Sequence, residues 1–206
     1  NSTSSSSVRI YPASSGSSTS GLNSLFVYGT QLEVGSYATS YIPSLSGSTT
    51  TRLADACNNS GSAQDFNSES GVLYAEIAAL ADDLTNRKIS ISNGSSTQRI
   101  LLSYSTISNA LVFQVVNSTL QVNLSYILTD IKLLTKVAVK WKLNDFSFWV
   151  NGVEVAIDSS GLTPIGLTEL SFDRGFAGEN FYGKIKDLQV FTTALTDEQL
   201  AALTTI

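Results

Sequence analysis

The 206-residue sequence predicts an all-β domain, an antiparallel sandwich or a barrel, preceded by an extended segment. From Gly71 onward, short runs in which apolar and polar residues alternate recur along the chain, as in half-buried strands. Several of these runs end at residues that favour turns, such as Asn93-Gly94 and Asn151-Gly152. Hydrophobic residues make up 42% of the chain, which is enough to fill a core between two sheets.

The N-terminal segment, residues 1–56, differs in composition from the rest. Ser and Thr supply 12 of the first 20 residues, and a second such stretch covers residues 44–51. Between them, residues 25–34 predict one β-strand. A segment of this composition rarely buries enough apolar area to fold alone. We therefore expect two regions: a Ser/Thr-rich linker and strand segment, residues 1–56, and a β-sandwich domain, residues 57–206.

The strands of the sandwich are expected one after another from residue 70. The clearest is residues 136–142, where Val137, Val139 and Trp141 alternate with lysines, so that one face is apolar. Asn151-Gly152 predicts a type I′ turn that joins its two neighbouring runs into a hairpin. The predicted strands are residues 72–77, 88–92, 99–104, 110–116, 136–142, 145–150, 153–157, 169–172 and 182–191.

One short helix is expected near the C-terminus. Thr196 is a good N-cap, and Gln199 stands where a capping box places Glu or Gln. Asp197 suits the positive end of the helix dipole. Leu200 and Leu203 form a short apolar stripe, so we expect the helix to pack on the edge or the end of the sandwich.

Composition excludes several classes of function. The chain has no histidine and one cysteine, which rules out a histidine base, a disulfide framework and a Cys-rich zinc site. A net charge of −5 argues against nucleic acid as a partner, because phosphate binding needs a basic surface. No apolar run approaches the roughly 18 residues of a membrane span, so membrane insertion is not expected.

Three blocks of sequence resemble the concanavalin A-like lectin/glucanase domains of the laminin-G-like kind. They are residues 71–76 (GVLYAE), residues 137–141 with 148–152 (VAVKW and FWVNG), and residues 181–191 with 194–200 (FYGKIKDLQVF and ALTDEQL). The resemblance covers roughly residues 70–204. It implies a concanavalin A-like jelly-roll β-sandwich that ends in a short helix.

A second resemblance lies upstream. Residues 31–43 (QLEVGSYATSYIP), followed by Thr51-Arg52, are similar to a connector that precedes such domains in bacteriophage tail-fibre and related virion proteins. This resemblance implies a carbohydrate-binding adhesion domain at the receptor-binding end of a phage tail or head fibre. It would act outside the cell on a host cell-surface glycan, alongside other virion proteins, and as a homotrimer. Two alternatives stay open: a structural virion module without a glycan ligand, and an accessory glycan-binding domain of a secreted bacterial protein.

Hydrolysis is considered because glucanases share this fold. Retaining glycosidases need two carboxylates about 5–5.5 Å apart. The acidic residues that the family carries at alternate positions of one strand have no counterpart here, and the spacing of Glu154 and Asp158, or of Asp82 and Asp83, does not match. Without histidine there is also no nucleophilic triad. The sequence therefore predicts no enzymatic activity.

Calcium is considered because many relatives bind it through loop oxygens. A calcium site needs six to eight oxygen ligands with several negative charges. The loops offer only short sets of donors, which we expect to act as ordinary polar loop residues, so no metal and no cofactor is predicted; bound calcium stays open as the less favoured alternative. The donors are Asp82, Asp83, Asn86, Asp173, Glu179 and Asn180.

A carbohydrate site needs exposed aromatic faces and planar polar side chains. Alternation places Trp149 opposite the core residues Phe148 and Val150, and the Gly-rich residues 173–182 predict a projecting loop. The competing expectations are burial of Trp149 under a neighbouring strand, subunit or linker, and an ordinary turn in the loop. The predicted ligand-binding residues are Trp149, Asn151, Asp173, Arg174, Asn180 and Tyr182.

Overall fold

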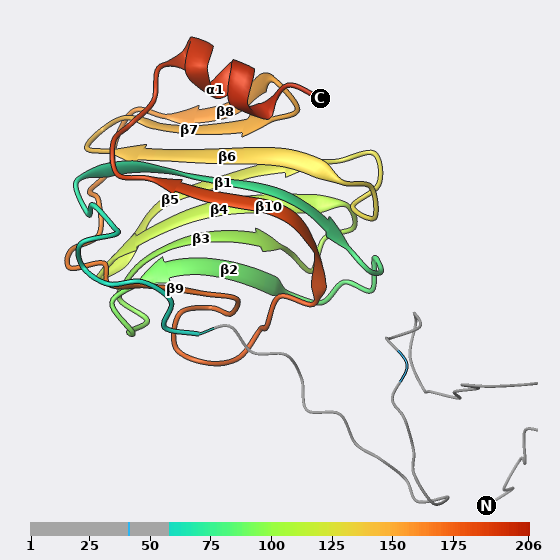
Figure 1. The fold of residues 1–206 in the computed structure, drawn as a ribbon, viewed down its shortest axis with the longest axis horizontal. Helices are drawn as coiled ribbons and strands as arrows, with labels where there is room; N and C mark the ends of the chain where they lie inside the picture. Colours follow the sequence, from blue (N-terminus) through green and yellow to red (C-terminus); the bar gives the residue numbers. More distant parts are fainter. Residues whose placement is uncertain (1–40, 42–57) are drawn as a thin grey trace, which may run out of the picture. The chain divides into compact units, whose positions relative to one another are not determined.

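The computed structural model describes Tyr41 and residues 58–206, and Ala54–Ile206 forms a compact unit of its own. Two antiparallel sheets of five strands lie face to face (Figure 1), which confirms the predicted β-sandwich. Sheet A has the strand order β5-β4-β3-β2-β9, and sheet B has the order β10-β1-β6-β7-β8. The elements are β1 (Ser70–Ala79), β2 (Arg87–Ser92), β3 (Gln98–Tyr104), β4 (Ala110–Asn117), β5 (Thr119–Ile127), β6 (Thr135–Lys142), β7 (Phe146–Val150), β8 (Val153–Asp158), β9 (Glu169–Ser171), β10 (Gly183–Phe191) and α1 (Asp197–Thr204).

The core lies between the two sheets and is built by strand alternation. In sheet B, Leu73 is paired with Val139, which is paired in turn with Phe148, so three apolar side chains lie side by side on one face. All three are fully buried, together with Phe113 of the facing sheet. Burying each such side chain contributes about 1.5–3 kcal/mol, so this layer supplies much of the stability of the sandwich.

Gly71 lies where the β1 backbone closely approaches a core ring. A Cβ at this position would overlap the Trp141 ring and lie 2.6 Å from the carbonyl oxygen of Phe191. The ring carbons of Trp141 fill the space that a side chain would take, and the indole Nε1 donates a hydrogen bond of 3.0 Å to the carbonyl of Asn67. The second residue of strand β1 is therefore the residue type that fits this contact.

Strand β5 was not among the strands predicted from the sequence. Its residues Val122 and Leu124 face the core, in alternation with polar residues. The connection from β4 is a tight turn at Ser118, whose φ of 58° is left-handed. Because this turn contains no glycine, it lacks the usual signal for a hairpin.

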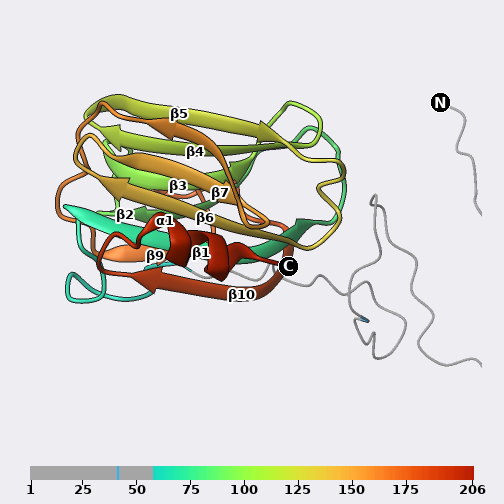
Figure 2. The ribbon, with the colours of Figure 1, turned by 90° about the horizontal axis from the view of Figure 1, so that it is seen from above.

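The C-terminal helix α1 is confirmed, with its capping box. The Thr196 hydroxyl accepts a hydrogen bond from the amide of Gln199, and the Gln199 side chain accepts one from the amide of Thr196. The helix packs on the outer face of sheet B, against β6, β7 and β8, and not on the edge or end of the sandwich as expected (Figures 1 and 2). Among the described residues, no helix has the length and the apolar character needed to span a membrane.

The N-terminal predictions lie outside the described residues. They concern the strand at residues 25–34 and, apart from Tyr41, the connector-like residues 31–43. The domain boundary at residues 56 and 57 stays a prediction as well.

Candidate functional site

Trp149 is buried, so the expectation of an exposed stacking ring at this position is wrong. The side chain points to the outer face of sheet B, as alternation predicts, but α1 covers it there and leaves it 6% exposed. It packs with Leu200 of the helix and with Val72 and Ala138 of the neighbouring strands. Its indole Nε1 donates a 3.0 Å hydrogen bond to the Ser147 hydroxyl. Trp149 therefore anchors the helix.

Asn151 forms the turn between β7 and β8 in sheet B. Its φ of 49° is left-handed, a conformation that asparagine tolerates better than most residues. The Asn151 side-chain oxygen accepts a 3.0 Å hydrogen bond from the amide of Lys136, and the Asn151 amide donates to the Lys136 carbonyl. The structure thus gives Asn151 a role in the turn and does not bring it together with the predicted loop residues.

The other four predicted residues do share one segment, the loop between β9 and β10. We call residues 172–182 the β9–β10 loop. It lies over the outer face of β2 in sheet A: the Lys88 amide donates to the Glu179 carbonyl at 3.0 Å, and the Ser92 hydroxyl lies 3.2 Å from the Gly175 carbonyl. This cover explains why Ser92, on the face opposite the core, has no exposed surface. The predicted residues in the loop are Asp173, Arg174, Asn180 and Tyr182.

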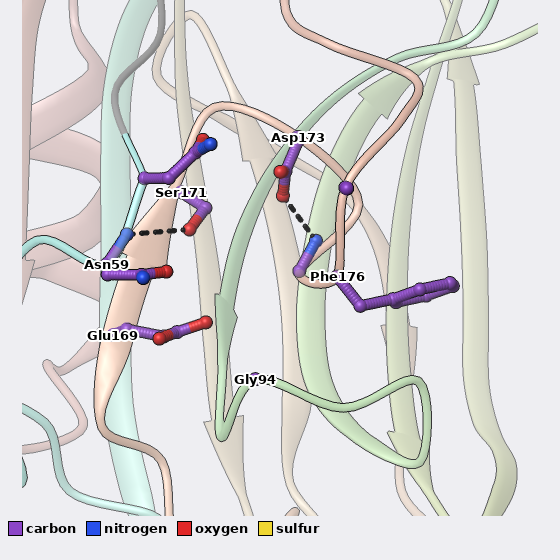
Figure 3. Close-up of a pocket in the computed structure, with 9 residues that line it drawn as sticks. Asn59, Gly94, Glu169, Ser171, Asp173 and Phe176 are labelled. Atoms are coloured by element: carbon purple, nitrogen blue, oxygen red, sulfur yellow. Dashed lines mark hydrogen bonds between the residues drawn. The ribbon is translucent and has the colours of Figure 1, made fainter.

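Asp173 shapes the loop from inside. It is only 3% exposed, and its carboxylate accepts a 2.6 Å hydrogen bond from the amide of Gly175 (Figure 3). Gly175 has a φ of 89°, and a Cβ there would lie 3.0 Å from Ser92, so the turn requires glycine. The structure therefore assigns Asp173 a turn-forming hydrogen bond, which the sequence prediction of a ligand contact did not include.

Asn180 and Tyr182 lie at the end of the loop. The Asn180 amide lies 3.4 Å from the Tyr182 hydroxyl, and Tyr182 is 45% exposed. These two residues thus match the predicted arrangement of an exposed aromatic beside a polar side chain.

The loop also builds a cluster of three side chains, Arg99, Phe176 and Arg174, which we call the arginine–phenylalanine cluster. The guanidinium carbon of Arg174 lies 4.1 Å from the centre of the Phe176 ring, and that of Arg99 lies 5.0 Å from it. Both distances are within the range of cation–π contacts. Arg99 further donates to the Arg174 carbonyl at 2.7 Å, and Arg174 donates through Nε to the Ala177 carbonyl at 2.7 Å. Phe176 remains 37% exposed, so the cluster reaches the surface.

The two arginines of this cluster carry charge that no neighbour neutralises directly. None of the ion pairs between described residues includes Arg99 or Arg174. Burial, and then the charge of Arg174, lower the pKa of the Arg99 guanidinium, while Glu179 acts in the opposite direction. The Arg99 Nε is buried without a hydrogen-bond partner among the described residues. An anion placed here would therefore meet two guanidinium groups that lack a carboxylate partner.

A hollow of about 320 Å³ lies beside the loop and shares Phe176 with the cluster (Figure 3). In this view Phe176 extends away from Glu169. The hollow has two carboxylates in its lining, Glu169 and Asp173, so it does not suit an anionic ligand. The lining residues are Asn58, Asn59, Gly94, Glu169, Ser171, Asp173, Gly175, Phe176 and Ala177.

Besides Asp173 and Glu179, two more of the oxygen donors weighed for calcium have other partners. Asp83 forms an ion pair with Arg87 at 2.6 Å, and the Asp82 carboxylate accepts a 2.5 Å hydrogen bond from the Ser108 hydroxyl. Across the described part of the chain, no three His, Cys, Asp or Glu side chains lie close enough together to hold a metal ion.

Sequence reasoning did not single out Arg99 and Phe176. Arg99 precedes the core residues Ile100 and Leu102 on β3, so alternation already places it on the outer face. Phe176 lies within the Gly-rich loop whose projection was predicted. The sequence carries no signal that the loop contacts Arg99, because the two are far apart in the chain: Arg99 and Arg174, which are hydrogen-bonded, are separated by 75 residues.

Solved structures with the same β-sandwich fold match this chain, but their sequence identity to it is low. No protein-family model and no curated protein matches the sequence. Among solved structures, the CBM40 module of the Ruminococcus gnavus IT-sialidase bound to α2,3-sialyllactose has a TM-score of 0.56 and 17% identity, and the match covers 67% of this chain and 84% of that one. The leech intramolecular trans-sialidase in complex with 2,7-anhydro-Neu5Ac has a TM-score of 0.55 and 15% identity, over 68% of this chain and 24% of that one.

A neighbour from a different class of enzyme shares the same fold. Domain 4 of AbnA, an extracellular arabinanase from Geobacillus stearothermophilus, in complex with arabinotriose, has a TM-score of 0.55 and 12% identity, with 70% of each chain covered. The chain therefore has the β-sandwich fold found in carbohydrate-binding modules of glycan-active enzymes.

Proposed function

We propose that this chain is a non-catalytic carbohydrate-binding module whose arginine–phenylalanine cluster holds an acidic sugar. The observation that carries the proposal is the pair of guanidinium groups beside the exposed ring of Phe176, with no carboxylate paired to either among the described residues. Arginine binds carboxylates through two parallel hydrogen bonds. An aromatic ring beside it offers an apolar surface to the sugar.

Charge favours an acidic ligand over a neutral one. The chain has a net charge of −5, so two unpaired cations at one surface position form a local exception to its overall charge. Among the fold neighbours, the Ruminococcus gnavus module binds sialyllactose, which carries a carboxylate, and the arabinanase domain binds arabinotriose, which is neutral. The two guanidinium groups of the cluster favour a ligand that carries a carboxylate.

The absence of catalysis is part of this proposal. The chain has no histidine, and two carboxylates, Glu169 and Asp173, line the nearby hollow. The Asp173 carboxylate is only 3% exposed and accepts a hydrogen bond from the loop backbone, so we assign it to the turn and not to an acid–nucleophile pair. A retaining glycosidase needs a nucleophilic and an acidic carboxylate facing one bond.

We further propose, on the resemblance of residues 31–43 to a virion connector, that the module acts as a host adhesin in a phage tail or head fibre. In that setting it would work outside the cell, as a homotrimer together with other virion proteins, on a host cell-surface glycan. The alternatives are a structural virion module and an accessory domain of a secreted bacterial protein. Light scattering on the full chain tests the homotrimer, and a monomer at micromolar concentration contradicts it.

A glycan array tests the binding function. We expect the full chain to bind acidic glycans, and Arg174→Ala to weaken that binding about tenfold or more, since a hydrogen bond to a charged group contributes about 1.5–3 kcal/mol. Lys142→Ala is the matched control, because it removes an exposed positive charge from the other sheet. Binding that is unchanged in Arg174→Ala contradicts the site, and no glycan binding at all favours the structural virion module.

A further inference from the structure

A polar groove crosses the outer face of sheet A beside the β9–β10 loop. It has a volume of about 290 Å³, and we call it the β3–β5 groove. Most of its lining consists of hydroxyl and amide side chains. The lining residues are Asn86, Lys88, Ser103, Ser105, Thr106, Ile107, Val112, Gln114, Asn123 and Ser125.

The strand register places these polar side chains in adjacent rows. Gln114 of β4 is paired with Asn123 of β5, and Val112 is paired with Ser125. The residues that alternate with them, such as Phe113, face the core. The outer face of these strands is therefore fixed by the same alternation that builds the core.

Several hydrogen-bonding groups in the groove are free to meet a ligand. The Gln114 amide nitrogen donates to the Asn123 side-chain oxygen at 3.1 Å. This bond holds both amides in place and leaves the Gln114 oxygen and the Asn123 nitrogen without a partner among the described residues. Asn123 and Ser125 are both exposed. Fixed planar amides with an unused donor and an unused acceptor suit the hydroxyl groups of a sugar.

The groove carries no free charge. Its one charged lining residue, Lys88, forms an ion pair with Glu179 of the loop, with 2.8 Å between Nζ and Oε2. A neutral polyhydroxyl ligand matches this lining, whereas a carboxylate would find no unpaired cation in it. The groove thus differs in chemistry from the arginine–phenylalanine cluster.

The two features share the outer face of one strand. Arg99 of the cluster and Ser103 of the groove both lie on β3, four residues apart, which corresponds to about 13 Å along a strand. This separation is longer than one sugar ring. A single monosaccharide bound at the arginines would not reach the amides of the groove.

We infer that the β3–β5 groove binds the neutral sugar residues next to the acidic one, so that the ligand is an oligosaccharide with an acidic end. This inference rests on the proposed function. The cluster supplies charge recognition, and the groove adds affinity for the neutral part.

Two probes separate the contributions: N-acetylneuraminic acid, which is only the acidic sugar, and α2,3-sialyllactose, which adds a neutral disaccharide. In isothermal titration calorimetry on the full chain, we expect α2,3-sialyllactose to bind about tenfold more tightly, a difference of about 1.4 kcal/mol. The double variant Gln114→Ala/Asn123→Ala should remove this difference and leave the affinity for N-acetylneuraminic acid unchanged. Gln189→Ala is the matched control, because it removes an exposed amide from β10 of the other sheet.

The outcomes distinguish the inference from the proposed function. Equal affinities for the two probes, or an unchanged sialyllactose affinity in the double variant, contradict ligand binding in the β3–β5 groove. Either result is still compatible with an acidic sugar bound at the arginine–phenylalanine cluster. If neither probe binds, or if Arg174→Ala leaves both affinities unchanged, the acidic site fails and the groove inference fails with it. NMR spectra of the side-chain amides add an independent readout: the signals of Gln114 and Asn123 should move with sialyllactose and not with N-acetylneuraminic acid.

Discussion

Lys88 of strand β2 and Glu179 of the β9–β10 loop are joined twice, by a 2.8 Å ion pair between their side chains and by a 3.0 Å hydrogen bond from the Lys88 amide to the Glu179 carbonyl. Glu179 has a left-handed φ of 55°, which is unfavourable for a residue with a side chain. These two bonds therefore hold a strained part of the loop against the sheet, between the arginine–phenylalanine cluster and the β3–β5 groove.

This pair predicts a pH effect on stability. Burial acts to raise the pKa of Glu179, but the hydrogen bond and the charge of Lys88, with help from Arg174 and Asn86, outweigh it, so the pKa is lowered from its ordinary value of 4.5. Since the folded pKa lies below the unfolded one, the carboxylate stabilises the fold above pH 4.5, and this contribution is lost as the pH falls through the lowered pKa.

Urea unfolding at a series of pH values measures the effect. The free energy of unfolding should fall more steeply on acidification in the natural chain than in Glu179→Gln, which carries no titrating group at this position. Equal slopes in the two proteins would show that the ion pair does not stabilise the fold.

Trp149→Ala should reduce stability and not ligand recognition. Emptying a buried aromatic site costs about 3–5 kcal/mol, and the loss of the Trp149 ring would also free α1 from sheet B. Urea unfolding measures this cost, with Tyr182→Ala as the comparison because Tyr182 is exposed. A Trp149→Ala protein with unchanged stability and lost glycan binding would restore the original stacking prediction.

Gly71→Ala should destabilise the sandwich although it adds only a methyl group. The new Cβ would overlap the Trp141 ring and the Phe191 carbonyl, and overpacking of this kind costs about 1–3 kcal/mol. The midpoint of thermal unfolding is a sufficient measurement. An unchanged midpoint in the Gly71→Ala protein would show that the backbone at this contact moves apart without cost.

Arg174→Lys should lose most of the affinity for acidic glycans even though it keeps the positive charge. Lysine has no planar head group that could stack on Phe176, and its ammonium cannot offer two parallel hydrogen bonds to a carboxylate. We expect affinity to fall about tenfold. If Arg174→Lys binds as well as the natural chain, charge alone is sufficient and the paired hydrogen bonds are not used.

The sequence predicted the structure correctly where the structure depends on a local pattern of residues. Alternation placed Val139 and Trp141 in the core, and Thr196 marked the start of the helix. It was insufficient where one element covers another: the same alternation put Trp149 on the outer face of sheet B but carried no information about the helix lying above it. The contact between Arg99 and Arg174 depends on the path of a loop, so no local pattern could indicate it.

Helix α1 covers the outer face of sheet B over β6, β7 and β8, whereas the arginine–phenylalanine cluster and the β3–β5 groove lie on the outer face of sheet A. Among the described residues, the proposed ligand contacts therefore lie together on one face, and firm attachment to a glycan-coated surface would depend on avidity. Linking several copies raises the effective concentration of each free site, and the gain can reach about 10²–10⁴ when the spacing of the copies matches that of the ligands. Strength of attachment would then be set by the number and spacing of chains more than by the affinity of any one of them.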